Sequence, residues 1–191
     1  MGKYTTKMIE DNQVKEIITT IERGYICNGK YHRPNKQVAT ILLLQANLGC
    51  RINDIVHLQT ENIVFDGDAW KLNLIEQKTG KKRNFIVPKP VKDIIDNWCY
   101  EESIYSGRLF KISAQNVWKM MRQVCEYLGY SEVSCHSIRK NSGLRVFLSS
   151  GKDIALTCQY YQHSSPAITM KYLQRTSKQM DEALTNATFT L

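Results

Sequence analysis

The sequence predicts a mainly α-helical fold with one small antiparallel β-sheet, an α+β arrangement. Apolar residues recur at the three- and four-residue spacing of a helix through most of the chain. The alternation of apolar and polar residues that is typical of strands is confined to one short region, residues 70–87. The 191 residues suffice for one substantial domain. We expect a single domain over residues 1–191, with a core over 6–174 and a C-terminal tail over 175–191.

The first part of the chain predicts two helices joined by a loop. Thr6 to Arg23 carries isoleucines and a valine at helical spacing, and Gly24 follows as a stop signal. Cys27 to Lys36 is polar and basic, so we expect a loop there. Gln37 to Asn47 is strongly apolar, which predicts a buried helix that Gly49 ends.

A short third helix places one arginine in a tight connection. Asn53 is a residue type that caps helix N-termini well, so it predicts a helix from Asp54 to Leu58. A carboxylate in the first turn favours this start because it faces the positive end of the helix dipole. Arg51 then lies between two helices, and it is the only charge in the apolar run Ala46 to Ile52.

A β-hairpin with a basic turn follows, and the rest of the chain is mostly helical. Trp70 to Leu74 and Arg83 to Val87 are the two strands, and Gln77 to Lys82 is the turn. The end of the chain, Asn186 to Leu191, suits a small strand or a frayed tail. The remaining predicted helices are Val91 to Glu101, Ser113 to Leu128, Ser137 to Ser149, Ile154 to Gln162, and one that Ser165 and Pro166 open.

Composition narrows the class of partner. The net charge of +8 and the pI of about 9.2 favour a polyanion, of which nucleic acid is the usual one, although a basic protein without such a partner fits the same totals. The six cysteines show neither a Cys-x-x-Cys pair nor zinc-site spacing, so we expect reduced thiols and no metal. Without a signal peptide or an apolar run of membrane-spanning length, we expect a cytoplasmic protein.

Two arginines are candidates for binding a phosphodiester. Cleaving this bond without a metal needs cations on the non-bridging oxygens, a positioned nucleophile and an acid for the leaving oxygen. The guanidinium suits the first task because it stays charged and makes paired hydrogen bonds to phosphate. Arg51 and Arg139 are therefore the candidates, although a solvated surface position is the ordinary place of a basic residue.

Two histidines and a tyrosine complete the candidate set. His136 precedes Arg139 by three residues, which places both on one face near a helix start. Tyr172 follows His163 by nine residues (172 − 163 = 9). Each of these side chains alone is compatible with a packing role. The pair Tyr160–Tyr161 offers competing hydroxyls, but its apolar helix is more typical of packing residues.

In this order and with these gaps, the residues resemble the tyrosine recombinases of the phage integrase family. The resemblance covers almost the whole chain, from about Thr6 to Gln174. Leu48 to Ile55 resembles the first family box, in which Arg51 matches the first catalytic arginine. Asp54, three residues later, matches its acidic partner.

The remaining family positions are also filled. Lys78 in the hairpin turn matches the catalytic lysine, and His136 to Arg139 resembles the second box. His163 matches a position that is histidine or tryptophan in the family, and Tyr172 matches the nucleophile. Because all positions occur in order, the set is far more specific than any single motif.

The departures from the family pattern are small. Gln162 stands where glycine is frequent, Lys140 where histidine is frequent, and Asp54 where glutamate is commoner, so its reach is one methylene shorter. None of them removes a catalytic group. The N-terminal core-binding and arm-binding domains of such enzymes are absent from this chain, so we expect either an excised fragment or a short homologue.

The resemblance implies a site-specific recombinase or integrase that integrates or excises a mobile element. Tyr172 would attack the scissile phosphate, giving a 3′-phosphotyrosine and a free 5′ hydroxyl. The two arginines would hold the non-bridging oxygens, the two histidines would hydrogen-bond the phosphate, and His136 would help to deprotonate the nucleophile. Lys78 would protonate the leaving oxygen, while Asp54 would orient the other groups. No metal, ATP or other cofactor is needed, because the covalent bond conserves the phosphodiester energy.

The implied partner is double-stranded DNA at attachment sites, bound in bacterial cytoplasm by a bacterial or phage-encoded protein. In the family, strand exchange occurs in a homotetramer; accessory DNA-bending or directionality factors are common, and nothing in this sequence demands one. The tail after Tyr172 suits packing onto a neighbouring protomer or onto its own core. The basic residues expected to face the DNA backbone in part are Lys71, Lys81, Lys82, Arg83, Lys89, Arg33, Lys36, Lys119 and Arg122.

Three other interpretations stay open. The chain fits a catalytically idle DNA-binding fragment that keeps the fold and the basic surface. A type IB topoisomerase would use the same chemistry to relax supercoils, although the small size and the integrase-like boxes favour a recombinase. A chance constellation in a protein that binds no DNA is the third, and the filled order of positions counts against it.

Overall fold

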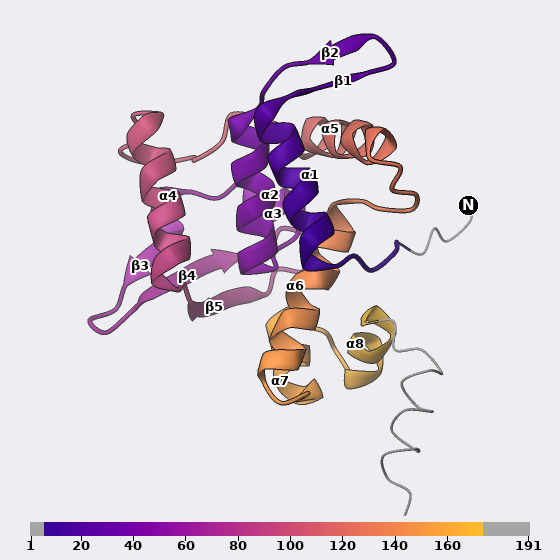
Figure 1. Cartoon of the computed structure of the whole chain (residues 1–191). Coiled ribbons are helices and arrows are strands. Elements are labelled where there is room, and N and C mark those ends of the chain that lie inside the picture. Colours follow the sequence, from indigo (N-terminus) through magenta and orange to yellow (C-terminus); the bar gives the residue numbers. More distant parts are fainter. Residues whose placement is uncertain (1–5, 174–191) are drawn as a thin grey trace, which may run out of the picture. The chain divides into compact units, whose positions relative to one another are not determined.

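The computed structural model describes residues 6–173 of a chain that divides into two compact units, Met1–Ser142 and Gly143–Leu191. Figure 1 shows the arrangement of the elements. In chain order these are α1 (Asp11–Arg23), β1 (Tyr25–Cys27), β2 (Lys30–His32), α2 (Lys36–Leu48), α3 (Ile52–Val56), the 3-10 helix η1 (Thr60–Asn62), β3 (Ile63–Phe65), β4 (Trp70–Ile75), β5 (Lys82–Ile86), α4 (Lys89–Glu101), α5 (Ala114–Tyr127), α6 (Cys135–Ser149), α7 (Ile154–Tyr161) and α8 (Pro166–Tyr172).

The core of the first unit is built around α2, the apolar helix expected from the sequence. Val38, Ile41, Leu42 and Leu44 are fully buried, and α1 lies alongside α2 (Figure 1). The helix α1 is amphipathic, so its isoleucines enter the same core while its polar residues face solvent. Burial of these aliphatic side chains removes apolar surface from water and provides the main stabilisation of the unit.

The expected hairpin is part of a three-stranded antiparallel sheet in the order β3–β4–β5. Its register pairs Leu74 with Arg83 and Ile75 with Lys82, so the turn between β4 and β5 carries residues 76–81. Because side chains alternate between the two faces of a strand, Leu72 and Leu74 point into the core. The sheet therefore presents the hairpin turn at a fixed position next to the core.

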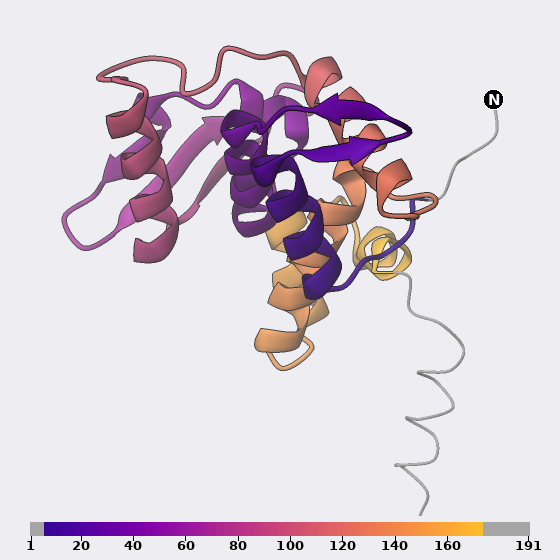
Figure 2. The ribbon, with the colours of Figure 1, turned by 45° about the horizontal axis from the view of Figure 1, so that its top comes forward.

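A second hairpin, β1–β2, occupies part of the segment that we expected to be a loop. Tyr25 pairs with His32 across it, and the turn lies at Asn28 and Gly29, both with positive φ. The hairpin lies beside α5 (Figure 2). The ring of Tyr25 stacks there on that of Tyr127, at 4.7 Å between centroids. The loop expectation for this segment was therefore wrong.

Two helix starts test the capping expectations. Ser113 caps α5 as expected, since its side chain accepts from Asn116 N–H at 3.3 Å. Asn53 does not cap α3, because the helix starts two residues earlier and Arg51 occupies the N-cap position. The side-chain amide of Asn53 instead donates to Gln77 Oε1 in the hairpin turn. The short helix is confirmed, but its expected start was wrong.

The second unit begins within α6 and contains α7 and α8. Phe147, Tyr161 and Leu173 form its buried apolar cluster. The side chain of Asp153 caps α7 by accepting from the N–H groups of Ala155 and Leu156. Ser165 and Pro166 open α8 as expected, with proline at an early position where its missing N–H costs nothing. The mainly helical α+β class is confirmed; the tail predictions over 186–191 lie outside the described residues.

Candidate active site

Arg51 lies at the start of α3, directly after the turn that ends α2. Gly49 adopts the left-handed conformation (φ +57°) that commonly stops a helix. The extended backbone of Arg51 then lets its carbonyl accept the N–H of Asp54 at 2.9 Å, which begins the new helix. The Arg51 side chain is 21% exposed, and its Nη1 donates to Glu76 Oε2. Arg51, the candidate residue for binding phosphate, is thus partly exposed to solvent while its guanidinium pairs with a carboxylate.

Glu76 is a buried carboxylate at the end of β4. Its Oε1 accepts from Arg83 Nη1 at 2.9 Å and lies 4.0 Å from Arg139 Nη1. Its Oε2 accepts from Arg51 and, at 2.6 Å, from Thr79 Oγ1. Burial alone raises the pKa of Glu76, but the hydrogen bonds from Thr79, Arg83 and Arg51 outweigh it and lower this pKa to about 2. Three arginines therefore converge on one ionised carboxylate.

Lys78 and Asp54 meet this cluster through the hairpin turn. Asp54 is buried, and its Oδ1 accepts from Gln77 N–H at 3.0 Å, so it fixes the backbone directly before Lys78. Burial raises the pKa of Asp54, and the hydrogen bond from Gln77 opposes this shift. The Lys78 side chain itself is exposed at the tip of the turn. The lysine is thus carried by a turn whose base is anchored to α3.

His136 and Arg139 come from the first turns of α6. Arg139 is 2% exposed, whereas His136 keeps contact with solvent. Partial removal from water, followed by the positive charges of Arg139, Arg51 and Lys78, lowers the pKa of His136. A neutral imidazole at this place can accept a proton. The first unit therefore brings together Arg51, Lys78, Asp54, His136 and Arg139.

The second unit holds His163 and Tyr172 in one aromatic cluster. The rings of His163 and Tyr172 meet edge to face, 5.2 Å apart between centroids. Tyr161 stacks on His163 at 4.8 Å and contacts Tyr172 edge-on at 4.8 Å. His163 Nδ1 and Thr169 Oγ1 are hydrogen-bonded at 2.9 Å. Because Thr169 lies one turn before Tyr172 on α8, this bond links the histidine to the helix of the candidate nucleophile.

The basic residues proposed to face DNA differ in their surroundings. Arg83 is fully buried, where it pairs with Glu76 and lies over the Phe85 ring at 5.0 Å, so it cannot reach a DNA backbone. Its expected role is corrected by this burial. Lys36 pairs with Glu101, Lys71 with Asp66 and Lys89 with Asp93. The side chains of this set that are exposed, as the DNA-binding prediction requires, are Arg33, Lys36, Lys81, Lys82, Lys89, Lys119 and Arg122, and Lys71 is partly exposed.

The sequence did not reveal the roles of Glu76 and Thr169, nor that Tyr161 packs against His163 and Tyr172. Glu76 had a detectable signal: the inward alternation of Leu72 and Leu74 assigns the next inward position of the strand to a charged residue. A charge at a core position is costly unless it is paired, so a cationic neighbour could have been expected. Tyr161 was interpreted as a packing residue, and its complete burial confirms this.

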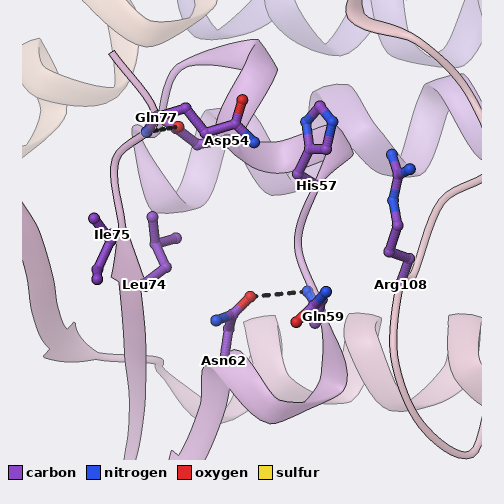
Figure 3. Close-up of a pocket in the computed structure, with 8 residues that line it drawn as sticks. All are labelled: Asp54, His57, Gln59, Asn62, Leu74, Ile75, Gln77 and Arg108. Atoms are coloured by element: carbon purple, nitrogen blue, oxygen red, sulfur yellow. Dashed lines mark hydrogen bonds between the residues drawn. The ribbon is translucent and has the colours of Figure 1, made fainter. Parts of the chain in front are cut away.

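A polar pocket adjoins the cluster in the first unit (Figure 3). Its wall includes Asp54, bonded to Gln77, and the N–H of Gln59, which donates to Asn62 Oδ1 at 2.9 Å. Its amide, imidazole and guanidinium groups differ from the apolar lining of most small-molecule cavities. The residues that line it are Asp54, His57, Gln59, Asn62, Leu74, Ile75, Gln77 and Arg108.

Metal-ligand clusters and membrane-spanning helices are both absent from residues 6–173. Within residues 6–173, no three His, Cys, Asp or Glu side chains are grouped so that they could hold a metal ion. No described helix is long and apolar enough to cross a membrane. The six cysteines are free thiols, as the sequence predicted.

Comparison with known proteins identifies relatives over most of the chain. The model of the phage integrase family matches residues 7–179. A probable integrase/recombinase, YoeC of Bacillus subtilis, is 30% identical over 164 residues, which cover 81% of this chain and 84% of that protein. Tyrosine recombinase XerA of Pyrococcus furiosus is 25% identical over 194 residues, 97% of this chain. The chain spans 63% of the length of that relative.

Solved structures show the same fold. A crystal structure of a lambda integrase dimer bound to a COC′ core site superimposes with a TM-score of 0.69 at 17% identity. The superposition covers 91% of this chain and 61% of that chain. At this level of identity, the likeness establishes the architecture.

Proposed function

Because the chain belongs to the phage integrase family of tyrosine recombinases, we propose that it cleaves and rejoins DNA through a covalent bond between Tyr172 and a 3′ phosphate. The observation that carries the proposal is the convergence of Arg51 and Arg139 on one point. Both guanidiniums direct Nη1 toward the carboxylate of Glu76. Two cations held this close can share the two non-bridging oxygens of one phosphate.

The proposed reaction assigns one task to each group. The Tyr172 hydroxyl attacks the phosphorus, and Arg51 and Arg139 stabilise the charge that grows on the non-bridging oxygens. His136, whose pKa is lowered, accepts the tyrosine proton. Lys78 protonates the 5′ oxygen as the bond to phosphorus breaks, which leaves a 5′ hydroxyl.

His163 has a supporting task in this scheme. When the Thr169 hydroxyl donates to Nδ1, the proton of the neutral ring is on Nε2, where it can donate to a phosphate oxygen. The scheme requires the second unit to bring His163 and Tyr172 to the arginine pair on DNA. Reversal of the attack by the 5′ hydroxyl of another strand would complete recombination, and we propose that four protomers do this at an attachment site of a mobile element.

Covalent trapping of a nicked duplex tests the chemistry. A nick beside the scissile phosphate releases the short 5′-hydroxyl fragment, so the adduct cannot be resealed and runs as a shifted band on a denaturing gel. We expect the wild-type protein to form this band with candidate attachment-site duplexes in the presence of EDTA. Tyr172→Phe should abolish the band and leave DNA binding within about 2-fold, because only the attacking oxygen is removed.

The matched control is Tyr160→Phe, a second tyrosine of the same unit that lies outside the proposed mechanism. It should keep the band. An adduct that persists in Tyr172→Phe would disprove the assignment of the nucleophile. Binding without any adduct, over the full set of candidate duplexes, would indicate a DNA-binding fragment without cleavage activity.

A further inference from the structure

Glu76 lies at the centre of the arginine cluster, and the family resemblance assigned it no role. It is fully buried, yet it carries a charge that lies against Arg51, Arg83 and Arg139. Burying such a carboxylate costs free energy of folding unless cations and hydrogen bonds replace the water molecules that it loses. The structure supplies both, so the position of this carboxylate must be closely defined.

The two carboxylate oxygens of Glu76 contact different members of the cluster. Oε2 receives Arg51 and Thr79, and Oε1 receives Arg83 at 2.9 Å with Arg139 at 4.0 Å. The two arginines proposed to hold the phosphate therefore contact different oxygens of one rigid group. One carboxylate therefore lies against both guanidiniums.

Backbone hydrogen bonds hold Glu76 itself in place. Its N–H donates to Lys81 O at 2.9 Å, and its carbonyl accepts from Gly80 N–H at 2.8 Å. These bonds close the base of the turn that carries Lys78. Glu76 cannot shift without opening the end of the β4–β5 hairpin. The arginines that bind Glu76 are therefore held in a fixed position relative to the sheet.

Charge repulsion explains why such a group is needed. Arg51, Arg83 and Arg139 all approach the same small volume, and in a medium of low polarity like charges repel strongly. The carboxylate offsets this repulsion before DNA arrives. Its pKa of about 2 means that it stays ionised throughout the neutral range.

We propose that Glu76 is a positioning residue for DNA cleavage, which pre-arranges Arg51 and Arg139 as a pair for the scissile phosphate without touching DNA. The inference rests on the proposed function of Tyr172. It adds that transition-state stabilisation depends on a carboxylate behind the arginines. The expected signature is a slower chemical step with almost unchanged DNA affinity, because a fully buried side chain such as Glu76 makes no direct contact with a bound duplex.

Glu76→Gln is the primary variant. The amide keeps the size of the side chain but removes the charge and turns one acceptor into a donor that faces arginine N–H groups. We expect the single-turnover rate of adduct formation on the nicked duplex to fall about 10- to 100-fold, the range seen when outer supporting groups are removed. The dissociation constant for the duplex should change less than about 3-fold.

Two further variants control for folding. Glu76→Asp keeps the charge at a shorter reach, so it should restore part of the rate if charge and position both matter. Glu61→Gln removes an exposed carboxylate of the same unit, which accepts from Gly107 N–H, and should leave the rate unchanged. Circular dichroism and thermal unfolding verify that each protein is folded, and Glu76→Asp carries the test if the glutamine variant is not.

A chemically altered duplex separates the arginines from Lys78. Sulfur in place of the 5′ bridging oxygen leaves as a thiolate, which needs no proton donor because a thiol is far more acidic than an alcohol. Lys78→Ala should regain most of its rate on this duplex, whereas Glu76→Gln should stay slow. Full recovery of Glu76→Gln would overturn the proposal, because Glu76 would then act through the lysine alone.

Two other results would overturn the proposed role of Glu76. A Glu76→Gln rate within about 2-fold of wild type would overturn the proposal, since supporting groups that matter cost about 10-fold or more. A loss of rate that only matches a loss of folded protein in Glu76→Gln and Glu76→Asp would also overturn it. If the wild-type protein forms no adduct while it binds DNA, the proposed function fails first, which keeps the two failures distinguishable.

Discussion

Replacing Gly143 by alanine tests the packing that holds the aromatic cluster of the second unit. Gly143 lies within α6, and the ring of Tyr161 occupies the space that a Cβ at this position would take. A Cβ at this position would lie 1.7 Å from Tyr161 Oη, 1.9 Å from Cζ and 2.4 Å from Cε2. Ordinary van der Waals contact needs about 3.4 to 4 Å, so the whole ring must move.

Two opposing effects decide the stability of Gly143→Ala. In an open helix, alanine in place of glycine would stabilise the protein by about 1 kcal/mol. Forcing a methyl group into a packed core costs about 1–3 kcal/mol, and here the cost should fall at about 2–3 kcal/mol, because the obstacle is a rigid, fully buried ring rather than a flexible chain end. We expect a net destabilisation of about 1–2 kcal/mol, a decrease of roughly 2–8 °C in the unfolding midpoint at this chain length.

The same movement should reach the candidate site. Tyr161 contacts both His163 and Tyr172 at 4.8 Å between ring centroids, so its displacement changes the setting of both. Adduct formation should therefore fall by more than the loss of folded protein explains. Thermal unfolding followed by circular dichroism gives the first quantity, and single-turnover trapping below the midpoint gives the second.

Ser149→Ala is the matched control on the same helix. Its hydroxyl only donates to the carbonyls of Arg145 and Val146 at an exposed position, so alanine should be neutral or slightly stabilising. If Gly143→Ala is as stable as wild type or more stable, the packing of Tyr161 on Gly143 is refuted. If stability falls but the folded protein reacts normally, the link from Tyr161 to the nucleophile is refuted.

Two other predictions concern single hydrogen bonds and charge. Thr169→Val removes the hydroxyl next to His163 Nδ1 without changing side-chain shape, so adduct formation should fall about 10-fold, and Thr169→Ser should restore it; equal rates for valine and serine would contradict the role. Because the pKa of Glu76 is lowered from 4.5 to about 2 in the fold, its ionisation stabilises the protein above about pH 4.5 and this contribution, about 3 kcal/mol, is lost as the pH falls toward 2. Urea unfolding should therefore show a gap between wild type and Glu76→Gln that narrows in acid, and a gap independent of pH would contradict the pairing.

The helices were predictable because their apolar spacing is regular, whereas their ends depend on local contacts. We expected the first helix from Thr6, but α1 starts at Asp11, since the side chain of Gln13 accepts from the N–H of Glu10 and closes the start. Glutamate is not a typical N-cap residue, so the sequence pattern did not reveal this helix start. The β1–β2 hairpin did have a signal, the Asn28-Gly29 turn, which favours a tight hairpin.

The candidate site was predictable as a set of residues, but its supporting contacts were not. The order of arginines, histidines and tyrosine is visible in the sequence because family motifs are local. Arg83 was wrongly assigned to DNA because a basic residue next to a basic turn suggests an exposed patch. Its pairing with Leu74 across the strands places it on the buried face, and only the register shows this.

The two acidic residues near the arginines divide the work differently from the pattern that the resemblance implied. Asp54 matches the acidic partner of the first arginine, yet its hydrogen bond goes to the backbone of Gln77, and burial raises its pKa. Glu76 receives the arginine bonds instead, and its pKa is lowered. Asp54 therefore stabilises the turn that carries Lys78, and the negative charge that offsets the arginines resides on Glu76. A shorter aspartate at the family position is tolerable for this reason, since a second carboxylate supplies the ion pair that Asp54 does not make.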